Sequence, residues 1–347
     1  MPPLENNRRS FLKKTALAAA ALTVGKLNAK PFSGQEIFVS ENIILPPRLN
    51  PGDTIALTAP AGAIFNDDSI EKATASFESQ GFRVMHGETL SQKFGYLAGT
   101  DEFRAQELMD LFENSEVKAI VAMRGGWGCA RLLQLLDFQS IKHHPKIISG
   151  FSDISSLLLA IYVKTGLITF HGPVGNSTLD GFTMEQFLRI VRDGETVNMQ
   201  QPSTDPLSVF SSGQAVGKLF GGNLAVWNSM IGTGFLPSTS DAIFFLEETE
   251  EEPYQVDRML TQLNLTGMLS QAAGIIFGKC TKCEAEEPEK SFTIDEVLKQ
   301  KLSNLNIPVV SGFNFGHIKD KFTFPIGATV TFDTATSSIQ LTHSCVS

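Results

Sequence analysis

Ser152 lies where an apolar run ends and a helix is expected to begin. Residues 146–149 have the composition of a buried strand, Gly150 and Phe151 follow, and residues 154–165 favour a helix. A serine on such a tight turn projects its hydroxyl, and the N–H groups at the helix start point outward. This geometry suits a nucleophile, because an oxyanion needs donors on the side of the attacking oxygen.

The same turn has a simpler interpretation as a helix N-cap. Ser152 and Asp153 are of the residue types that are favoured as caps. Ile154 also stands where the Gly-x-Ser-x-Gly elbow has its second glycine. Taken alone, this motif favours the cap over the nucleophile.

Glu247 and His317 follow two other apolar runs. Glu247 comes directly after the run 243–246 and opens an acidic stretch whose last members, residues 250–252, are expected to be solvated. His317 follows the run 313–316, which ends in glycine. A serine, a carboxylate and an imidazole at strand ends are the components of a hydrolytic triad, in which the serine attacks, the histidine takes its proton and the carboxylate orients the imidazole.

Residues 124–128, Arg-Gly-Gly-Trp-Gly, end a further apolar run. Glycines there let the backbone approach a ligand, and free N–H groups can bind an anion. The segment lacks the Gly-x-Gly-x-x-Gly spacing of dinucleotide sites. Gly213 to Gly217 and Gly274 to Gly278, each followed by lysine, enclose three residues where a Walker loop needs four. Nucleotide binding is therefore not the leading hypothesis.

The cysteines raise a metal hypothesis. Cys280 and Cys283 form one Cys-x-x-Cys pair, and His343 and Cys345 could join them around zinc. Only one such pair is present, so a surface disulfide or free thiols are favoured over zinc. The adjacent His143 and His144 are predicted to lie in a loop. They have no carboxylate partners nearby in the sequence, so no metal site is predicted there.

The first part of the chain alternates between predicted strands and helices. Such alternation is typical of a parallel sheet covered by helices, in which ligands bind beyond the carboxyl ends of the strands. The predicted strands are 54–58, 83–86, 119–123 and 146–149, and the predicted helices are 69–81, 101–114 and 154–165.

The pattern changes after about residue 195. Residues 196–213, rich in proline and small polar residues, are expected to be a linker between an N-terminal domain, 48–195, and a C-terminal domain, 214–347. The second domain is also predicted to be α/β. Its expected helices are 223–231 and 254–265, and its expected strands are 242–246, 273–277, 330–332 and 338–341.

The N-terminus has the pattern of an export signal. Arg8 and Arg9 precede Ser-Phe-Leu-Lys and a short apolar run, 15–24, which is too short to span a bilayer. Residues 1–29 therefore resemble a twin-arginine signal peptide and predict a periplasmic protein; an N-terminal helix of the fold is the alternative. Residues 30–47 are expected to be a poorly structured lead-in.

Composition and charge bound the function further. The chain has 347 residues, 42% of them hydrophobic, and a net charge of −9, so a globular protein of about two domains is expected. Removal of residues 1–29 takes away five basic residues and one acidic residue, which makes the charge −13. Binding to nucleic acid is therefore not expected. No other stretch approaches membrane-spanning length, so no stable membrane insertion is expected after signal removal.

Taken together, these motifs resemble the LD-carboxypeptidase (muramoyltetrapeptide carboxypeptidase) family of serine peptidases. The resemblance covers nearly all of the chain after the signal, and the order and spacing of the motifs are more specific than any one of them. The matching segments are 52–56, 59–60, 124–128, 150–154, 170–173, 221–224, 246–248, 253–254, 257–260 and 316–317.

The resemblance implies an α/β fold and a set of roles. It implies a flavodoxin-like, parallel-sheet N-terminal domain and a smaller α/β C-terminal domain of the swivelling β/β/α type. Ser152 would be the nucleophile, with Glu247 and His317 from the second domain. The backbone N–H groups of Asp153 and Gly126 would form the oxyanion hole. Arg124, Gly125 and Asn223 would bind the substrate, and Arg124 suits a terminal carboxylate.

The implied reaction releases terminal D-alanine from a murein tetrapeptide, by hydrolysis of the L,D bond through an acyl-enzyme on Ser152. No metal or organic cofactor is implied, and a homodimer is expected. Members that recycle murein are typically cytoplasmic, whereas this chain has an export signal. Other members cleave peptidyl-nucleotide antibiotics or other amides, and Trp127, where tyrosine is common, does not decide between the groups.

Two hypotheses from other classes remain open. Two exported α/β domains with a cleft between them also fit a periplasmic peptide-binding protein, which would bind murein peptides without forming product. A serine esterase would turn over small acyl esters and cleave peptides poorly.

Overall fold

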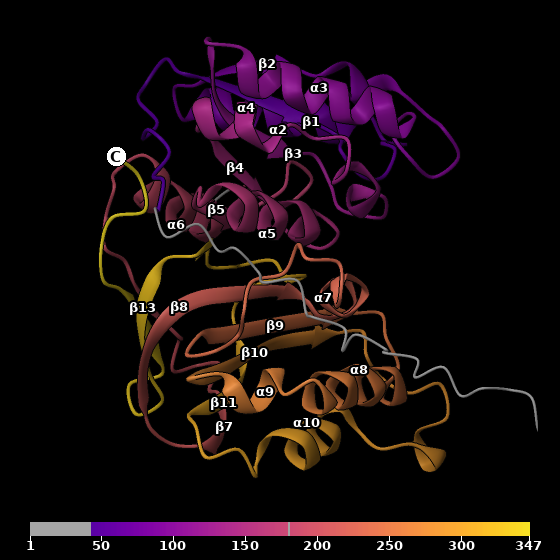
Figure 1. Cartoon of the computed structure of the whole chain (residues 1–347), viewed down its shortest axis with the longest axis vertical. Helices are drawn as coiled ribbons and strands as arrows, with labels where there is room; N and C mark the ends of the chain where they lie inside the picture. Colours follow the sequence, from indigo (N-terminus) through magenta and orange to yellow (C-terminus); the bar gives the residue numbers. More distant parts are fainter. Residues whose placement is uncertain (1–42, 180) are drawn as a thin grey trace, which may run out of the picture. The chain divides into compact units, whose positions relative to one another are not determined.

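A computed structural model describes residues 43–179 and 181–347, which belong to one compact unit, Ile37–Ser347. The predicted signal peptide, 1–29, and most of the lead-in, 30–42, lie outside the described residues. Two sheets, each with its own helices, form this unit (Figure 1). In the part of the chain that is described, no helix is long and apolar enough to cross a membrane.

The first sheet has the strand order β12-β5-β4-β3-β1-β2. Its strands β1 to β5 are parallel, and β12 pairs antiparallel with β5 at the edge. The order 2-1-3-4-5 is that of flavodoxin-like folds, as predicted. The strands are β1 (Thr54–Thr58), β2 (Arg83–His86), β3 (Val117–Ala122), β4 (Ile147–Gly150), β5 (Thr169–His171) and β12 (Phe324–Ile326).

Helices cover this sheet and leave its central strands almost fully buried. Buried parallel strands are near-continuous apolar runs because neither face meets water, which is why β1 and β3 were recognisable in the sequence. The helices are α2 (Asp68–Ser79), α3 (Asp101–Glu113), α4 (Phe138–His143), α5 (Ile154–Thr165) and α6 (Gly181–Val191), with short 3-10 turns at η1 (Glu88–Ser91) and η2 (Cys129–Leu132).

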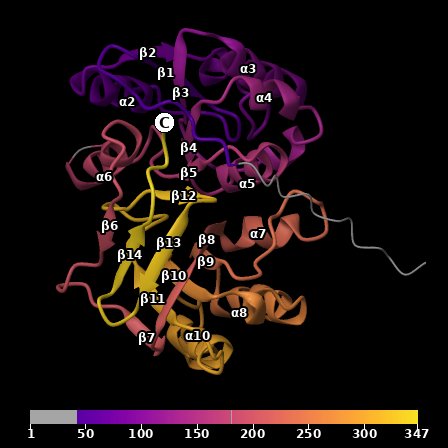
Figure 2. The ribbon, with the colours of Figure 1, turned by 60° about the vertical axis from the view of Figure 1, so that its left-hand side comes forward.

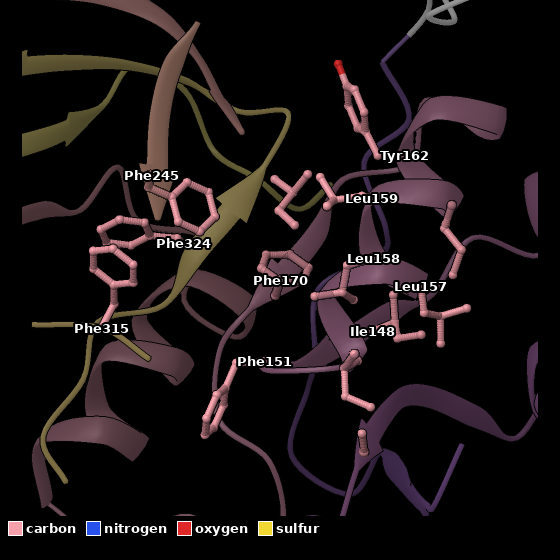
Figure 3. Packing of buried hydrophobic residues seen from close by; sticks show 14 of the residues in the cluster. Ile148, Phe151, Leu157, Leu158, Leu159, Tyr162, Phe170, Phe245, Phe315 and Phe324 are labelled. Carbon is pink, nitrogen blue, oxygen red and sulfur yellow. The ribbon is translucent and has the colours of Figure 1, made fainter. Parts of the chain in front are cut away.

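Helix α5 lies between the two sheets. It contacts β4, β5 and β12 of the first sheet, and β8 (Gln214–Asn223) and α7 (Leu224–Met230) of the second set of elements. All its residues except Lys164 are buried, as expected for a helix that is apolar all round. Figure 3 shows its leucines packed beside Ile148 and Phe170. Because α5 is held on all sides, the turn before it, which carries Ser152, is fixed relative to both sheets.

The second sheet has the order β6-β14-β13-β8-β9-β10-β11-β7. Strands β8 to β11 are parallel, and the outer strands pair antiparallel. The remaining strands are β6 (Asn198–Gln200), β7 (Ser208–Ser211), β9 (Ile243–Thr249), β10 (Gly274–Thr281), β11 (Val309–Phe313), β13 (Thr329–Asp333) and β14 (Ser338–Leu341). Helices α8 (Pro253–Leu265), α9 (Met268–Gln271) and α10 (Ile294–Leu302), with the 3-10 turn η3 (Pro288–Lys290), complete this part (Figure 1).

The segment expected to be a linker, 196–213, is part of the second sheet. Its two short strands pair at opposite edges, β6 with β14 and β7 with β11. Pro202 and Pro206 lie between these two strands, in residues 201–207, so the loop signal describes this connection and not the strands on either side of it. Two parts of the expected linker, 198–200 and 208–211, are therefore edge strands of the second sheet.

The chain also returns to the first sheet late, through β12, as Figure 2 shows. Sequence analysis did not predict this strand, because Pro325 at its centre argues against a strand. At the sheet edge a proline is permitted, since its missing N–H faces away from the ladder. The two sheets are therefore joined by several chain crossings rather than by one linker.

An aromatic cluster joins β12 to the second sheet. Phe324 of β12 lies 4.6 Å, between ring centroids, from Phe315 and 5.0 Å from Phe245 of β9. Figure 3 shows the three rings grouped together. Each is fully buried, and burial of one such side chain contributes about 2–3 kcal/mol. The cluster fixes two positions near the site, because Phe245 is two residues before Glu247 and Phe315 is two residues before His317.

Candidate active site

Ser152 occupies a strained turn between β4 and α5. Its φ of +64° is in the left-handed region, which costs a residue other than glycine about 1–2 kcal/mol. The helix-cap interpretation is wrong, because Asp153 occupies the N-cap position and its side chain makes no capping hydrogen bond. Its carboxylate instead accepts a hydrogen bond of 2.8 Å from the backbone N–H of Cys129.

Gly125 lies directly against Ser152. A Cβ at Gly125 would lie 2.6 Å from Ser152 Cβ and 2.8 Å from its Oγ, so only glycine fits there. The same Cβ would be 3.3 Å from the backbone nitrogen of Asp153. Gly126, at φ +121°, continues the loop in a conformation that favours glycine. Among the described residues, the backbone N–H groups of Asp153 and Gly126 donate to no backbone acceptor, so both can serve a ligand.

Glu247 and His317 form a hydrogen-bonded pair. The distance between His317 Nδ1 and Glu247 Oε2 is 2.7 Å, and Glu247 is fully buried. Burial alone would raise the pKa of Glu247, but the hydrogen bond from His317 holds that pKa below its ordinary value. A Cβ at Gly316 would lie 2.5 Å from Glu247 Oε2, so glycine before His317 makes the close approach possible.

A cavity of about 620 Å³ brings the predicted residues together. It is lined by Arg124, Gly125, Gly126, Ser152, Asp153, Asn223 and His317, while Glu247 lies behind His317. In the described chain, His317 bonds to Glu247 and, through its carbonyl, to Thr281, and not to Ser152. Serine–histidine hydrogen bonds are often long without substrate and tighten in the complex.

Arg124 and Asn223, the two polar residues predicted to bind substrate, differ in how fully their side chains are already hydrogen-bonded within the protein. The Arg124 guanidinium donates to the carbonyl oxygens of Gly125, at 3.3 Å, and Ala63, at 3.2 Å, and still lines the cavity. The Asn223 side chain is engaged at both ends. Its Nδ2 donates to Glu248 Oε1 at 2.8 Å, and its Oδ1 accepts from the Val226 N–H as the cap of α7. Asn223 therefore positions the start of α7 as well as lining the cavity.

Sequence analysis missed Glu248 as a site residue. Glu248 lines the cavity and accepts hydrogen bonds from Asn223, from the Ala225 N–H and from the Thr249 N–H. Burial raises its pKa to about 7, although these donors act in the opposite direction. Its position at the end of the buried strand β9 was the available signal, but the acidic run around it masked that signal.

Phe151 and Lys321 also belong to the surroundings of His317. The Phe151 ring packs edge-on against His317, with 4.9 Å between centroids. Lys321 Nζ lies 4.7 Å from the centroid of that ring, and burial lowers the pKa of Lys321 to about 8. No sequence motif singles out Lys321, because only the folded chain brings it to Phe151.

His171 is a buried, neutral neighbour of the pair. It is 1% exposed, and its Nε2 has no hydrogen-bond partner in the described chain. Burial lowers its pKa to about 4, and the opposing attraction of Glu247 does not compensate. In the unfolded chain the pKa of this histidine is about 6.5. Between about pH 4 and 6.5, the unfolded chain therefore binds a proton at His171 that the folded chain does not bind.

This difference predicts a pH-dependent stability. As pH falls from about 6.5 toward 4, protonation of the unfolded state lowers the free energy of unfolding, by about 3 kcal/mol at most. In His171→Gln this loss is absent, so the difference in free energy of unfolding between about pH 7 and pH 4.5 shrinks by about 2–3 kcal/mol. Urea unfolding at both pH values measures it. His143→Gln, at an exposed position, is the control. An equal change in the free energy of unfolding between the two pH values in both variants would contradict the role given to His171.

The three cysteines considered for a zinc site do not form one cluster. Cys280 and Cys283 form a disulfide, and Cys345 is a free, buried thiol. Of the two alternatives left open for the Cys-x-x-Cys pair, the disulfide is the one present. Within the described residues no group of three or more histidine, cysteine, aspartate or glutamate side chains could hold a metal ion.

Comparisons with known proteins show the family of the chain. The LD-carboxypeptidase N-terminal domain matches residues 55–172, and the LD-carboxypeptidase C-terminal domain matches residues 216–332. A probable murein peptide carboxypeptidase of Bacillus subtilis is 37% identical over 295 residues, which cover 84% of this chain and 92% of that protein.

Two solved structures share the fold. The microcin C7 self immunity protein MccF superposes with a TM-score of 0.81 at 26% identity, covering 88% of this chain and 100% of that chain. A muramoyltetrapeptide carboxypeptidase from Oxalobacter formigenes gives a TM-score of 0.73 at 31% identity, covering 83% of this chain and 97% of that chain. With both family domains present in order, the chain belongs to the LD-carboxypeptidase family and is a serine-type carboxypeptidase.

Proposed function

We propose that this protein hydrolyses the L,D peptide bond before the terminal D-alanine of murein tetrapeptides, through an acyl-enzyme on Ser152. The observation that carries the proposal is the arrangement of Ser152 and His317 on one cavity, with His317 Nδ1 2.7 Å from the buried Glu247 carboxylate. The names of the similar Bacillus subtilis and Oxalobacter formigenes proteins support the murein peptide as substrate class.

In the first half of the reaction, Ser152 Oγ attacks the carbonyl carbon of the L-residue. His317 Nε2 takes the hydroxyl proton, and Glu247 holds the Nδ1–H so that Nε2 faces the serine. The oxyanion accepts hydrogen bonds from the backbone N–H groups of Asp153 and Gly126. The C–N bond then breaks, His317 returns the proton to the leaving nitrogen, and D-alanine departs.

In the second half, water attacks the ester on Ser152. His317 takes a proton from the water, the same two N–H groups stabilise the new oxyanion, and the Ser152–acyl bond breaks. The proton returns to Ser152 Oγ, and the tripeptide leaves as a carboxylic acid. The balance is one water consumed for one peptide bond cleaved, so every step is accounted for by the chain, its substrate and water.

Arg124 is the group proposed to bind the terminal carboxylate of D-alanine. Its guanidinium lines the cavity beside Gly125 and Gly126, the loop that packs on Ser152. A planar guanidinium suits a carboxylate, because it can donate two parallel hydrogen bonds. This assignment explains a carboxypeptidase specificity, since a substrate without a free C-terminus has no carboxylate to offer.

The proposal is tested with two tetrapeptides that differ only in the configuration of the last alanine. We expect mass spectrometry to show the tripeptide and free D-alanine from the natural substrate, while the L-alanine analogue stays intact. Equal cleavage of both peptides would contradict an L,D-carboxypeptidase. Binding of the natural peptide with no product would instead support a peptide-binding protein, and cleavage of simple esters alone would support an esterase.

An exposed aromatic pair favours one second candidate, hydrolysis of a peptidyl nucleotide. Trp127 is 63% exposed, lines the cavity and meets Tyr96 edge-on at 5.9 Å between centroids. Exposed aromatic rings stack on nucleobases. The microcin C7 self immunity protein has been solved in complex with adenosine monophosphate and with aspartyl sulfamoyl adenosine. If this candidate is correct, Trp127→Ala lowers hydrolysis of a peptidyl nucleotide far more than hydrolysis of the tetrapeptide.

We further propose that the protein acts in the periplasm. The basic and apolar pattern of residues 1–29 supports export, and a disulfide is typical of oxidising compartments. In cells, a variant with Arg8→Lys and Arg9→Lys should remain in the cytoplasmic fraction while the wild type enters the periplasmic fraction. Unchanged fractionation of the variant would contradict a twin-arginine signal.

A further inference from the structure

The disulfide between Cys280 and Cys283 closes a two-residue loop at the end of β10. The loop contains Thr281 and Lys282, and Lys282 has a φ of +56°, a left-handed conformation that is rare for lysine. The disulfide bridges the two ends of this turn, with 5.7 Å between the Cα atoms. Without the bridge the turn has less to hold it in this conformation.

This loop is hydrogen-bonded to the backbone of His317 and to the strand that carries Glu247. Thr281 Oγ1 donates to the carbonyl oxygen of His317 at 3.1 Å. The Thr281 carbonyl accepts from the N–H of Glu250 at 2.9 Å and from Thr249 Oγ1 at 3.1 Å, which fixes the end of β9 directly after Glu247 and Glu248. A change in the loop is therefore transmitted to His317 and to the strand that carries its carboxylate.

The two cysteines differ in their exposure to solvent. Cys283 is 2% exposed, whereas Cys280 is partly exposed. Both contribute to the wall of a second cavity of about 530 Å³, which has no lining residue in common with the cavity of Ser152. The exposed Phe292 and the partly buried Lys279 also line this second cavity. An entering thiolate therefore reaches Cys280 Sγ more readily, and Cys283 is then the leaving group.

We propose that Cys280 and Cys283 form a thiol–disulfide exchange site for a dithiol reductant, and that reduction lowers activity by releasing His317 from its position. A thiolate of the reductant attacks Cys280 Sγ, and the bond to Cys283 Sγ breaks with Cys283 taking a proton. The second thiol of the reductant then attacks the reductant's first sulfur, which is bonded to Cys280 Sγ in the mixed disulfide. This bond breaks and Cys280 leaves as a thiol. Two electrons and two protons pass to the protein, and the reductant leaves as a disulfide.

The experiment equilibrates the full protein with mixtures of reduced and oxidised dithiothreitol. Alkylation and mass spectrometry give the fraction of reduced Cys280 and Cys283, and two readouts are taken on the same samples. One is kcat for D-alanine release, which rests on the proposed function. The other is the rate at which an organophosphonate labels Ser152, which depends on the serine and histidine whatever the natural substrate is.

We expect both readouts to fall about fivefold or more with the fraction reduced, to recover on reoxidation, and to leave KM nearly unchanged. The double variant Cys280→Ser, Cys283→Ser should have the low rate and no response to dithiothreitol. Thr281→Val, which keeps the disulfide but loses the bond to His317, should also be slow when oxidised. Cys345→Ala, at a free cysteine, should respond like the wild type.

Two results would overturn the proposal. One is a disulfide that dithiothreitol does not reduce in the folded protein, which would exclude an exchange site. The other is an unchanged phosphonate labelling rate in fully reduced protein, which would exclude coupling to His317. If labelling responds to reduction while no tetrapeptide is cleaved in either state, the redox proposal stands and the proposed substrate is wrong.

Discussion

Ser152→Ala is expected to lower kcat for D-alanine release about 10⁶-fold, the loss that removal of the nucleophile causes in serine hydrolases. The remaining cavity, with its two backbone N–H groups and Arg124, is unchanged, so the tetrapeptide should still bind with an affinity close to that of the wild type. Isothermal titration calorimetry with the tetrapeptide and a sensitive D-alanine assay measure the two quantities. Release of D-alanine at a rate near that of the wild type would remove Ser152 from the mechanism.

The matched variant Ser152→Gly separates catalysis from strain. Both variants lack the hydroxyl, so both should be inactive. Glycine accepts the left-handed φ of +64° without the Cβ conflict, although it also has the more flexible unfolded chain. We expect Ser152→Gly to exceed Ser152→Ala by up to about 1 kcal/mol in free energy of unfolding. A less stable glycine variant would contradict the strain assigned to this turn.

Glu247→Gln is expected to lower kcat about 10⁴-fold while preserving the volume of the buried side chain. The carboxylate accepts the hydrogen bond of His317 Nδ1 and stabilises the imidazolium that forms during acylation. A glutamine can donate its N–H to Nδ1, which favours the wrong tautomer and removes the charge. The loss should therefore appear in kcat rather than in KM.

Glu252→Gln is the control for the acidic run that contains Glu247. Glu252 is the N-cap residue of α8, and its backbone N–H donates to Gln255 Oε1 at 2.9 Å, a hydrogen bond that Glu252→Gln leaves in place. This variant should retain the kcat and the free energy of unfolding of the wild type. Similar losses in Glu247→Gln and Glu252→Gln would point to the charge of the whole run and not to a paired carboxylate.

Strand-end positions were predictable as site positions within each sheet, because the parallel strands of one sheet bring their carboxyl ends to one edge. Ser152 follows β4 of the first sheet, whereas Glu247 and His317 belong to the second, so this rule alone does not bring them together. The buried runs before Ser152, Glu247 and His317 were visible in the sequence, and glycine marked the close approach before His317. What the sequence could not decide was whether Ser152 caps the helix. Local sequence does not specify the sign of φ, and the left-handed turn results from the packing of Gly125 and α5 around it.

Other features depend on contacts between distant parts of the chain. Strand β12 forms because Phe324 packs on Phe245 and Phe315, a stabilisation that overrides the low strand propensity of Pro325. Likewise, Lys321 and His171 meet the site only through tertiary packing. No local pattern marks Lys321, and the matching segment 170–173 contains His171 without indicating its contact with the site.

The most direct test of the central claim is titration of the purified protein with an organophosphonate, with D-alanine release from the tetrapeptide measured in parallel. The label is located by mass spectrometry of the digested protein. We predict one adduct, on Ser152, and a loss of D-alanine release in proportion to the fraction labelled. Full activity with Ser152 completely labelled, or inactivation by an adduct at another residue, would contradict the assignment of Ser152 as the nucleophile.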